Sequence, residues 1–176
     1  HWVDGLLVRS KLREKTRLQW GRFVQNQFFS VWRNSGPILL SLLYLFPLLD
    51  IQNIIMDQID SKYWVVLFRR AMIKIANKVA QQHRYKVLIS GENIGQVASQ
   101  TLSNIATIDD ASSMPIIRPL AGHNKEEIVD QAEIIDTYQI SIEPYQDCCS
   151  YFVPPNPETK SRLHRIQMLE KKFKID

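Results

Sequence analysis

The sequence is poor in cysteine and has no apolar run long enough to cross a bilayer. Its only two cysteines, Cys148 and Cys149, are adjacent, which excludes a disulfide scaffold and favours the cytosol. The most apolar stretch, "PILLSLLYLFPLL" at residues 37–49, is too short for a membrane span and contains Pro47. We therefore expect a buried strand or core segment there, and no membrane anchor.

An N-terminal secretory signal is also absent. The chain starts with His1 rather than Met, so we expect a fragment of a longer protein. Its 176 residues suit one domain with a core, and 45% apolar with 23% charged residues is ordinary for a soluble globular protein. The net charge of +4, from 22 basic and 18 acidic residues, is mildly basic and compatible with an RNA partner.

The first 43 residues form an atypical leader. Residues 1–36 contain seven Lys or Arg and six Phe or Trp. Basic residues interleaved with aromatic ones suit contact with single-stranded nucleic acid, although a docked amphipathic helix or an atypical leader would also fit. We predict an unassigned segment at 1–43 and a separate domain at 44–176.

Strands and helices alternate from about residue 63 onward. Short apolar runs predict strands in "YKVLIS" (85–90), "MPIIRPL" (114–120) and "YQISI" (138–142). Pro115 and Pro119 should limit the hydrogen-bonded part of the second strand to the residues between them. This alternation predicts an α/β layered domain with parallel strands and crossover helices.

Helices are predicted between these strands. Asn124 and Glu127 have the spacing of a capping box, and "ETKSRLHRIQMLEKKF" (158–173) indicates a last, basic helix. The expected buried faces are Phe68, Met72, Ile75 and Val79 in the first helix, Ile94, Ala98, Leu102 and Ile105 in the second, and Ile128, Ala132 and Ile135 in the third.

Small and polar residues follow the first of these strands, in "SGENIGQVASQT" (90–101). Ligands of open parallel sheets bind outside the carboxyl ends of the strands, and Gly91 and Gly95 would let a backbone approach a flat ring or a phosphate. Gln96 and Gln100 could present amides to a base or ribose. A tight turn without a ligand is the competing interpretation.

The adjacent cysteines follow the third predicted strand. If they lie in a turn at the ligand edge, a reactive thiol is plausible; in a core they would be inert small hydrophobes. Two thiols make no zinc site without a histidine ligand, and the spacing indicates none. We therefore predict no metal site.

Four quoted segments carry a resemblance to a known family. "LFRRAMIKIANKVA", "SGENIGQVASQTLSNI", "MPIIRPLAGHNKEEIVDQAEIIDTYQISIEPYQDCC" and "FVPPNPETK" occur in order over about residues 44–165. Together they resemble the tRNA 4-thiouridine synthetase family, which is the tRNA sulfurtransferase also linked to thiamine biosynthesis. The match covers the later part of the adenylating PP-loop ATPase domain, so the resemblance implies a parallel-sheet PP-loop fold that is incomplete at its N-terminus.

The resemblance also implies an activity. Family members use ATP, with Mg²⁺, to adenylate O4 of a tRNA uridine. A cysteine persulfide, supplied by a cysteine desulfurase, then delivers sulfur to the activated carbon, and a second thiol resolves the resulting disulfide. The expected partner is tRNA, the expected location is the cytoplasm, and a homodimer is possible.

Particular residues take roles from the same resemblance. Arg69 of "LFRR", Gly91 of "SGEN" and Gln100 of "VASQ" would contact the nucleotide, and Cys148 or Cys149 of "PYQDCC" would handle sulfur. The family pattern does not choose between the two cysteines. If no nucleotide binds, Arg69 would be a surface cation, Gly91 would be part of a turn and Gln100 would be an amide on a helix face.

One family motif is missing. The phosphate-binding "SGGxDS" loop should precede residue 44, but only "NSGP" (34–37) and "SGEN" come close, and neither fits. Without those phosphate-binding donors we expect this chain alone to bind ATP weakly and to thiolate nothing. The alternatives are an inactive remnant that binds RNA or a partner through its basic termini, and a thiol or persulfide carrier that works without ATP.

Overall fold

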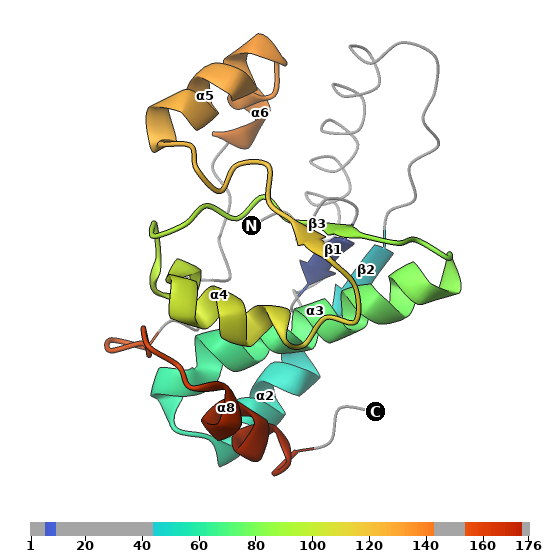
Figure 1. Cartoon of the computed structure of the whole chain (residues 1–176), viewed down its shortest axis with the longest axis vertical. Helices are drawn as coiled ribbons and strands as arrows, with labels where there is room; N and C mark the ends of the chain where they lie inside the picture. Colours follow the sequence, from blue (N-terminus) through green and yellow to red (C-terminus); the bar gives the residue numbers. More distant parts are fainter. Residues whose placement is uncertain (1–5, 10–43, 143–153, 174–176) are drawn as a thin grey trace, which may run out of the picture. The chain divides into compact units, whose positions relative to one another are not determined.

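The computed structural model describes residues 6–9, 44–142 and 154–173 (Figure 1). The described residues fall into two compact units, one of residues 6–9, 44–122 and 154–173 and one of residues 123–142. Within these ranges, none of the helices has the length and apolar character that a bilayer span requires. The predicted division at residue 43 stays a prediction.

The strands of the first unit pair in parallel, as predicted. Strand β1 (Leu6–Arg9) lies beside β2 (Tyr44–Pro47), and β3 (Leu88–Ile89) lies beside β4 (Ile116–Ile117). The stretch at 37–49 does supply a strand, whereas the strand at residues 6–9 was not predicted. The β3–β4 ladder is confined to the residues between the two prolines, which confirms the limit set by proline.

The third predicted strand is wrong. Residues Tyr138–Ser141 form a short helix, α6, in the second unit, where the Ser141 and Ile142 amides donate to the carbonyls of Thr137 and Tyr138 at 3.1 Å. Alternation over five residues is too short to separate a strand from a helical turn. Here the local hydrogen bonds satisfy the backbone without a neighbouring strand.

Helix α3 (Trp64–Gln82) follows the 3₁₀ turn η1 (Ser61–Tyr63) and is the long helix of the first unit (Figure 1). The helix exists as predicted, but among the four residues expected on its buried face only Phe68 is buried. The helix contacts both α2 (Leu49–Gln58) and α4 (Leu102–Asp109), so its buried face is wider than one stripe. The buried residues along it are Val66, Leu67, Phe68, Arg70, Ala71, Ile73, Ala76, Asn77 and Ala80.

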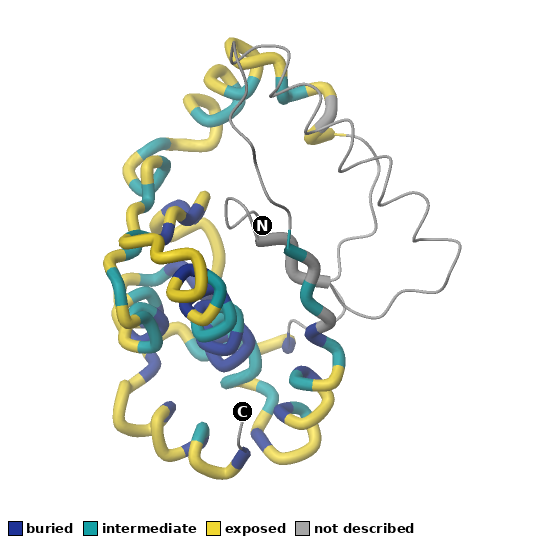
Figure 2. The backbone as a smooth tube through the Cα atoms, turned by 90° about the vertical axis from the view of Figure 1, so that its right-hand side faces the viewer, coloured by how far each residue is buried: buried dark blue, intermediate teal, exposed yellow. Residues whose placement is uncertain are grey.

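The core of the first unit gathers residues from helices far apart in sequence. Ile55 of α2 and Ile166 of α8 (Leu163–Glu170) are fully buried in the same cluster as Leu67. Burying a side chain of this size contributes about 1.5–3 kcal/mol. Figure 2 shows the buried positions along these helices alternating with exposed ones. The last, basic helix predicted within residues 158–173 exists, but it covers only Leu163–Glu170.

The predicted apolar face of the second helix is only partly right, because Ala98 and Ile105 are half-buried. Ile94 lies before the 3₁₀ turn η2 (Ala98–Gln100), and Ile94 and Leu102 are exposed. The buried face of α4 instead carries Asn104 and Thr107, next to Ile108. Polar side chains occupy this face because they hydrogen-bond the backbone of residues 158–161, which apolar periodicity does not detect.

The capping box of the third helix is confirmed. Asn124 Oδ1 accepts from the Glu127 amide at 2.9 Å, and Glu127 Oε2 accepts from the Asn124 amide at 2.7 Å, at the start of α5 (Lys125–Ile134). The predicted inner face is only partly right. Ala132 is half-buried, but Ile135 is 58% exposed.

Candidate functional site

The loop after β3 begins the candidate site. The Ser90 amide donates to the Ile117 carbonyl at 2.9 Å and extends the β3–β4 ladder by one bond. Gly91 follows with its backbone exposed, and Glu92 turns inward and is buried. The carboxyl end of β3 therefore places an accessible glycine beside a buried carboxylate.

Glu92 is held between two arginines. Its carboxylate accepts from the Arg69 guanidinium of α3 and, at 2.9 Å, from Arg118 Nε just beyond β4. Arg118 also pairs with both carboxylate oxygens of Asp109, at 2.9 and 2.5 Å. The four charged groups form one network that joins α3, α4 and the ends of both strands.

The network favours the charged forms of Glu92 and Arg118. Burial disfavours the charged form of Glu92, but Arg69 and Arg118 outweigh it and hold the pKa of Glu92 below its ordinary value. Burial likewise opposes the charge on Arg118, yet its bonds to Asp109 and Glu92 raise the pKa of Arg118. Glu92 is therefore ionised near neutral pH and can hold the Arg69 side chain by an ion pair.

Gln100 lies on the same loop. Its carbonyl accepts from the Gly95 amide at 2.9 Å, and the loop is also tied to the segment after β4 by the Ile94 amide, which donates to the Ala121 carbonyl at 3.2 Å. The Gly95 φ of +84° lies in the left-handed region, where glycine is favoured. These bonds fix the loop over residues 91–100.

Two buried polar atoms at this site lack a partner among the described residues. They are the Gln100 side-chain oxygen and the Arg69 Nε. Gln100 as a whole is only 3% exposed. A buried acceptor or donor without a partner costs about 1–3 kcal/mol.

Comparison with known proteins decides the family. Residues 24–175 match the family model described as "Thiamine biosynthesis protein (ThiI)". The chain belongs to the ThiI family. The resemblance read from the four sequence segments is thereby confirmed, as is the α/β PP-loop fold.

Curated relatives of the ThiI family agree. A probable tRNA sulfurtransferase of Halothermothrix orenii is 45% identical over 134 residues, which are 76% of this chain and 34% of that protein. One of Natranaerobius thermophilus is 48% identical over 119 residues, or 67% of this chain and 29% of that protein. The chain thus spans about a third of the length of the curated relatives it matches.

A solved structure matches nearly the whole chain. It is the crystal structure of a 4-thiouridine synthetase–RNA complex with bound ATP, with a TM-score of 0.81 and 37% sequence identity. The match covers 95% of this chain and 42% of the other one.

The structure of this ThiI-family chain brings some predicted site residues together. Arg69 contacts Glu92, the residue next to Gly91, and Gln100 closes the loop that Gly91 opens. Cys148 and Cys149 lie outside the described residues, and so does their surrounding turn. Because the preceding segment is helix α6, the prediction that a third strand carries the cysteines to this edge loses its basis.

Three charged residues of the site were not predicted as such. Glu92, Asp109 and Arg118 complete the network around Arg69. A signal was present for two of them, since Arg118 in "IIRP" directly follows an apolar strand and Glu92 in "SGEN" lies three residues after one. Charged residues at that position are typical of the functional edge of a parallel sheet.

Proposed function

We propose that this chain is part of an ATP-dependent tRNA sulfurtransferase that converts a tRNA uridine to 4-thiouridine. The reaction would use ATP with Mg²⁺, and sulfur from a cysteine persulfide that a cysteine desulfurase supplies. The same sulfur would serve thiamine thiazole synthesis, in the cytoplasm, with a homodimer as a possible assembly. Family membership and the similarity to an ATP-bound synthetase–RNA complex support this proposal.

The observation that carries the proposal is that two residues expected to contact the nucleotide, Arg69 and Gln100, each have a buried side-chain atom without a partner. Gln100 Oε1 is an acceptor and Arg69 Nε is a donor, and neither has a partner among the described residues. An adenine nucleotide offers an amine for the first and oxygens for the second. These residues fit ATP, which would supply the activation of the uridine oxygen as a leaving group.

The sulfur-handling role is proposed for Cys148 and Cys149. One thiol would carry or attack the persulfide, and the second would resolve the disulfide. Replacing each cysteine separately by serine tests this assignment. Because we expect no turnover from this chain alone, the readout is capture of persulfide sulfur from a donor, which should be lost in the variant that lacks the sulfur-handling thiol, with ATP binding unchanged.

A second candidate function rests on the six Lys or Arg from Lys160 to the end of the sequence. It is that of an inactive remnant that keeps the fold to bind RNA or a partner. Salt-dependent tRNA binding that survives loss of both cysteines, with no ATP binding, would favour this function. Persulfide trapping without nucleotide would instead favour a thiol carrier.

Gln100→Leu is the sharpest test of the proposed nucleotide site. Leucine keeps the side-chain size and removes an acceptor without a protein partner, so the free energy of unfolding should change by less than about 1 kcal/mol. Its affinity for ATP should fall about tenfold, which is the loss of one good hydrogen bond. Arg69→Gln should also weaken ATP binding, whereas Lys78→Gln, an exposed change on the same helix, should not.

Calorimetric titration with Mg-ATP and urea unfolding give the two readouts. Equal ATP affinity in Gln100→Leu and the unchanged chain would overturn the nucleotide site. A thiolation assay with tRNA, ATP and a persulfide donor tests the activity itself. We expect no turnover from this chain alone, and turnover equal to that of an intact relative would contradict this expectation.

A further inference from the structure

The segment that enters α8 is held firmly by the rest of the first unit. The Glu158 amide donates to the Lys62 carbonyl at 2.8 Å, and Asn104 Nδ2 donates to the Glu158 carbonyl at 2.7 Å. Thr101 Oγ1 donates to the Thr159 carbonyl at 2.7 Å. These bonds fix the backbone from which the next side chains leave.

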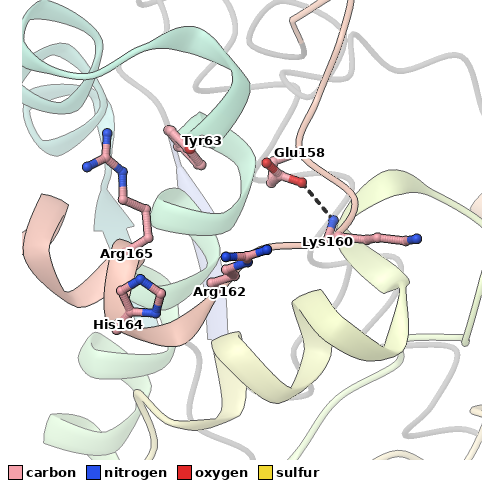
Figure 3. Close-up of a pocket in the computed structure, with 6 residues that line it drawn as sticks. All are labelled: Tyr63, Glu158, Lys160, Arg162, His164 and Arg165. Atoms are coloured by element: carbon pink, nitrogen blue, oxygen red, sulfur yellow. Dashed lines mark hydrogen bonds between the residues drawn. The ribbon is translucent and has the colours of Figure 1, made fainter.

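A basic pocket of about 280 Å³ lies along this segment (Figure 3). Its lining residues are Tyr63, Glu158, Lys160, Arg162, His164 and Arg165. The lining thus contains three basic side chains and one histidine but only one carboxylate. That carboxylate already accepts from the Lys160 amide at 2.8 Å.

The cations of this pocket differ from three buried or half-buried arginines of the first unit. Arg69, Arg70 and Arg118 each pair with carboxylates. Among the residues that the structure describes, Lys160, Arg162 and Arg165 form no ion pair with a carboxylate, and all three are exposed. Like charges placed together on a fixed backbone favour an anionic ligand.

The start of α8 adds to this attraction. Arg162 is the N-cap residue, and no side chain caps the helix there. The amides of the first helical turn are not capped by a side chain, and negative charge is stabilised near such a helix start. The cations and the helix end act in the same direction.

We propose that this pocket binds phosphates of an RNA backbone. The inference rests on the proposed function, because tRNA is the substrate named there, and it assigns a further contact surface to that substrate. Lys160 and Arg165 point away from each other in Figure 3. Cations spread in this way along an exposed segment suit successive phosphates of a chain better than the single triphosphate of ATP.

The test compares two triple variants of the full chain. The pocket variant is Lys160→Gln, Arg162→Gln and Arg165→Gln. The matched control is Lys78→Gln, Lys171→Gln and Lys172→Gln, which removes the same charge from exposed positions outside the pocket. Binding of unmodified tRNA is measured over a range of salt concentrations, and binding of Mg-ATP is measured in parallel.

The pocket variant should bind tRNA about tenfold more weakly than the control, with a salt slope shallower by roughly one or two units and ATP affinity unchanged. Equal tRNA affinity in the two variants would overturn the pocket and leave the proposed function standing. Loss of ATP affinity with unchanged tRNA affinity would also overturn it, and would assign the pocket to nucleotide phosphates. If the unchanged chain shows no salt-dependent tRNA binding, both proposals fail.

Discussion

Arg70 of α3 and Glu170 of α8 form a two-bond ion pair across 100 positions of the sequence. The distances are 3.0 Å from Nε to Oε1 and 2.9 Å from Nη2 to Oε2. Arg70 is almost completely buried, and it also donates to Asp110 and to the Thr107 carbonyl. Burial opposes its charge, but the bonds to Glu170 and Asp110 raise the pKa of Arg70. The last helix is therefore attached to the core by charge as well as by apolar contact.

Removing the carboxylate from this pair should destabilise the first unit strongly. Glu170→Gln removes the two-bond partner of the buried Arg70 and leaves it Asp110 as a carboxylate partner, so we expect a loss of about 2 kcal/mol in the free energy of unfolding. Urea unfolding followed by circular dichroism measures it. Asp57→Asn is the control, since Asp57 is exposed on α2. A loss below about 1 kcal/mol in Glu170→Gln would show that the pair contributes no more than a surface contact.

The paired carboxylates also predict a dependence of stability on pH. The pKa values of Glu92 and Glu170 lie below the ordinary 4.5, because their arginine partners outweigh the cost of burial. Below about pH 4.5 the unfolded chain therefore binds more protons than the folded one. The stability from both groups is fully present above that pH and is lost as the pH falls through their folded values.

Unfolding titrations between about pH 6 and about pH 3 test this prediction. Glu92→Gln should flatten the acid limb of the curve, because it removes one of the two groups. Asp57→Asn should leave the limb unchanged. A Glu92→Gln curve parallel to that of the unchanged chain would contradict the assignment.

The sequence predicted the features that depend on local signals. The capping box of Asn124 and the limits that Pro115 and Pro119 place on β4 each follow from a few neighbouring residues, and both are confirmed. The existence of α3 followed from a long helical pattern. The resemblance identified Arg69 and Gly91, which the structure places beside the same glutamate.

Features that depend on distant partners were not predicted. Arg70 looks like a surface cation until Glu170 and Asp110 surround it. Asn104 lies on the buried face of α4 because it bonds a backbone more than fifty positions away. The strand predicted at 138–142 was wrong for the opposite reason. Local helical hydrogen bonds form there despite the alternation of apolar and polar residues.

Asn104 provides a test of the attachment of residues 158–161. Its side chain is fully buried and bonds the Ala98 and Glu158 carbonyls at 2.7 Å and the Ser161 amide at 3.1 Å. Asn104→Ala leaves these groups unpaired, so we expect a loss of about 3 kcal/mol. Ser103→Ala, exposed on the same helix, should change stability by less than about 0.5 kcal/mol.

Hydrogen exchange of the Ser161 amide gives a second measurement. In Asn104→Ala this amide should lose protection before the amides in the middle of α3 do. Unchanged protection of Ser161 would mean that the segment is held without the Asn104 bond.

Gly95 provides a test of backbone conformation in the candidate nucleotide loop. A Cβ at this position would meet no atom within 4 Å, so Gly95→Ala creates no clash. Its φ of +84° is nevertheless costly for alanine, and we expect a loss of about 1 kcal/mol. Gly122→Ala is a matched control with equally open space and no left-handed φ. Because unfolded alanine has fewer conformations than glycine, that control should be neutral or slightly stabilised. Equal urea midpoints for the two variants would show that the left-handed turn at Gly95 is not required for the loop to close on Gln100.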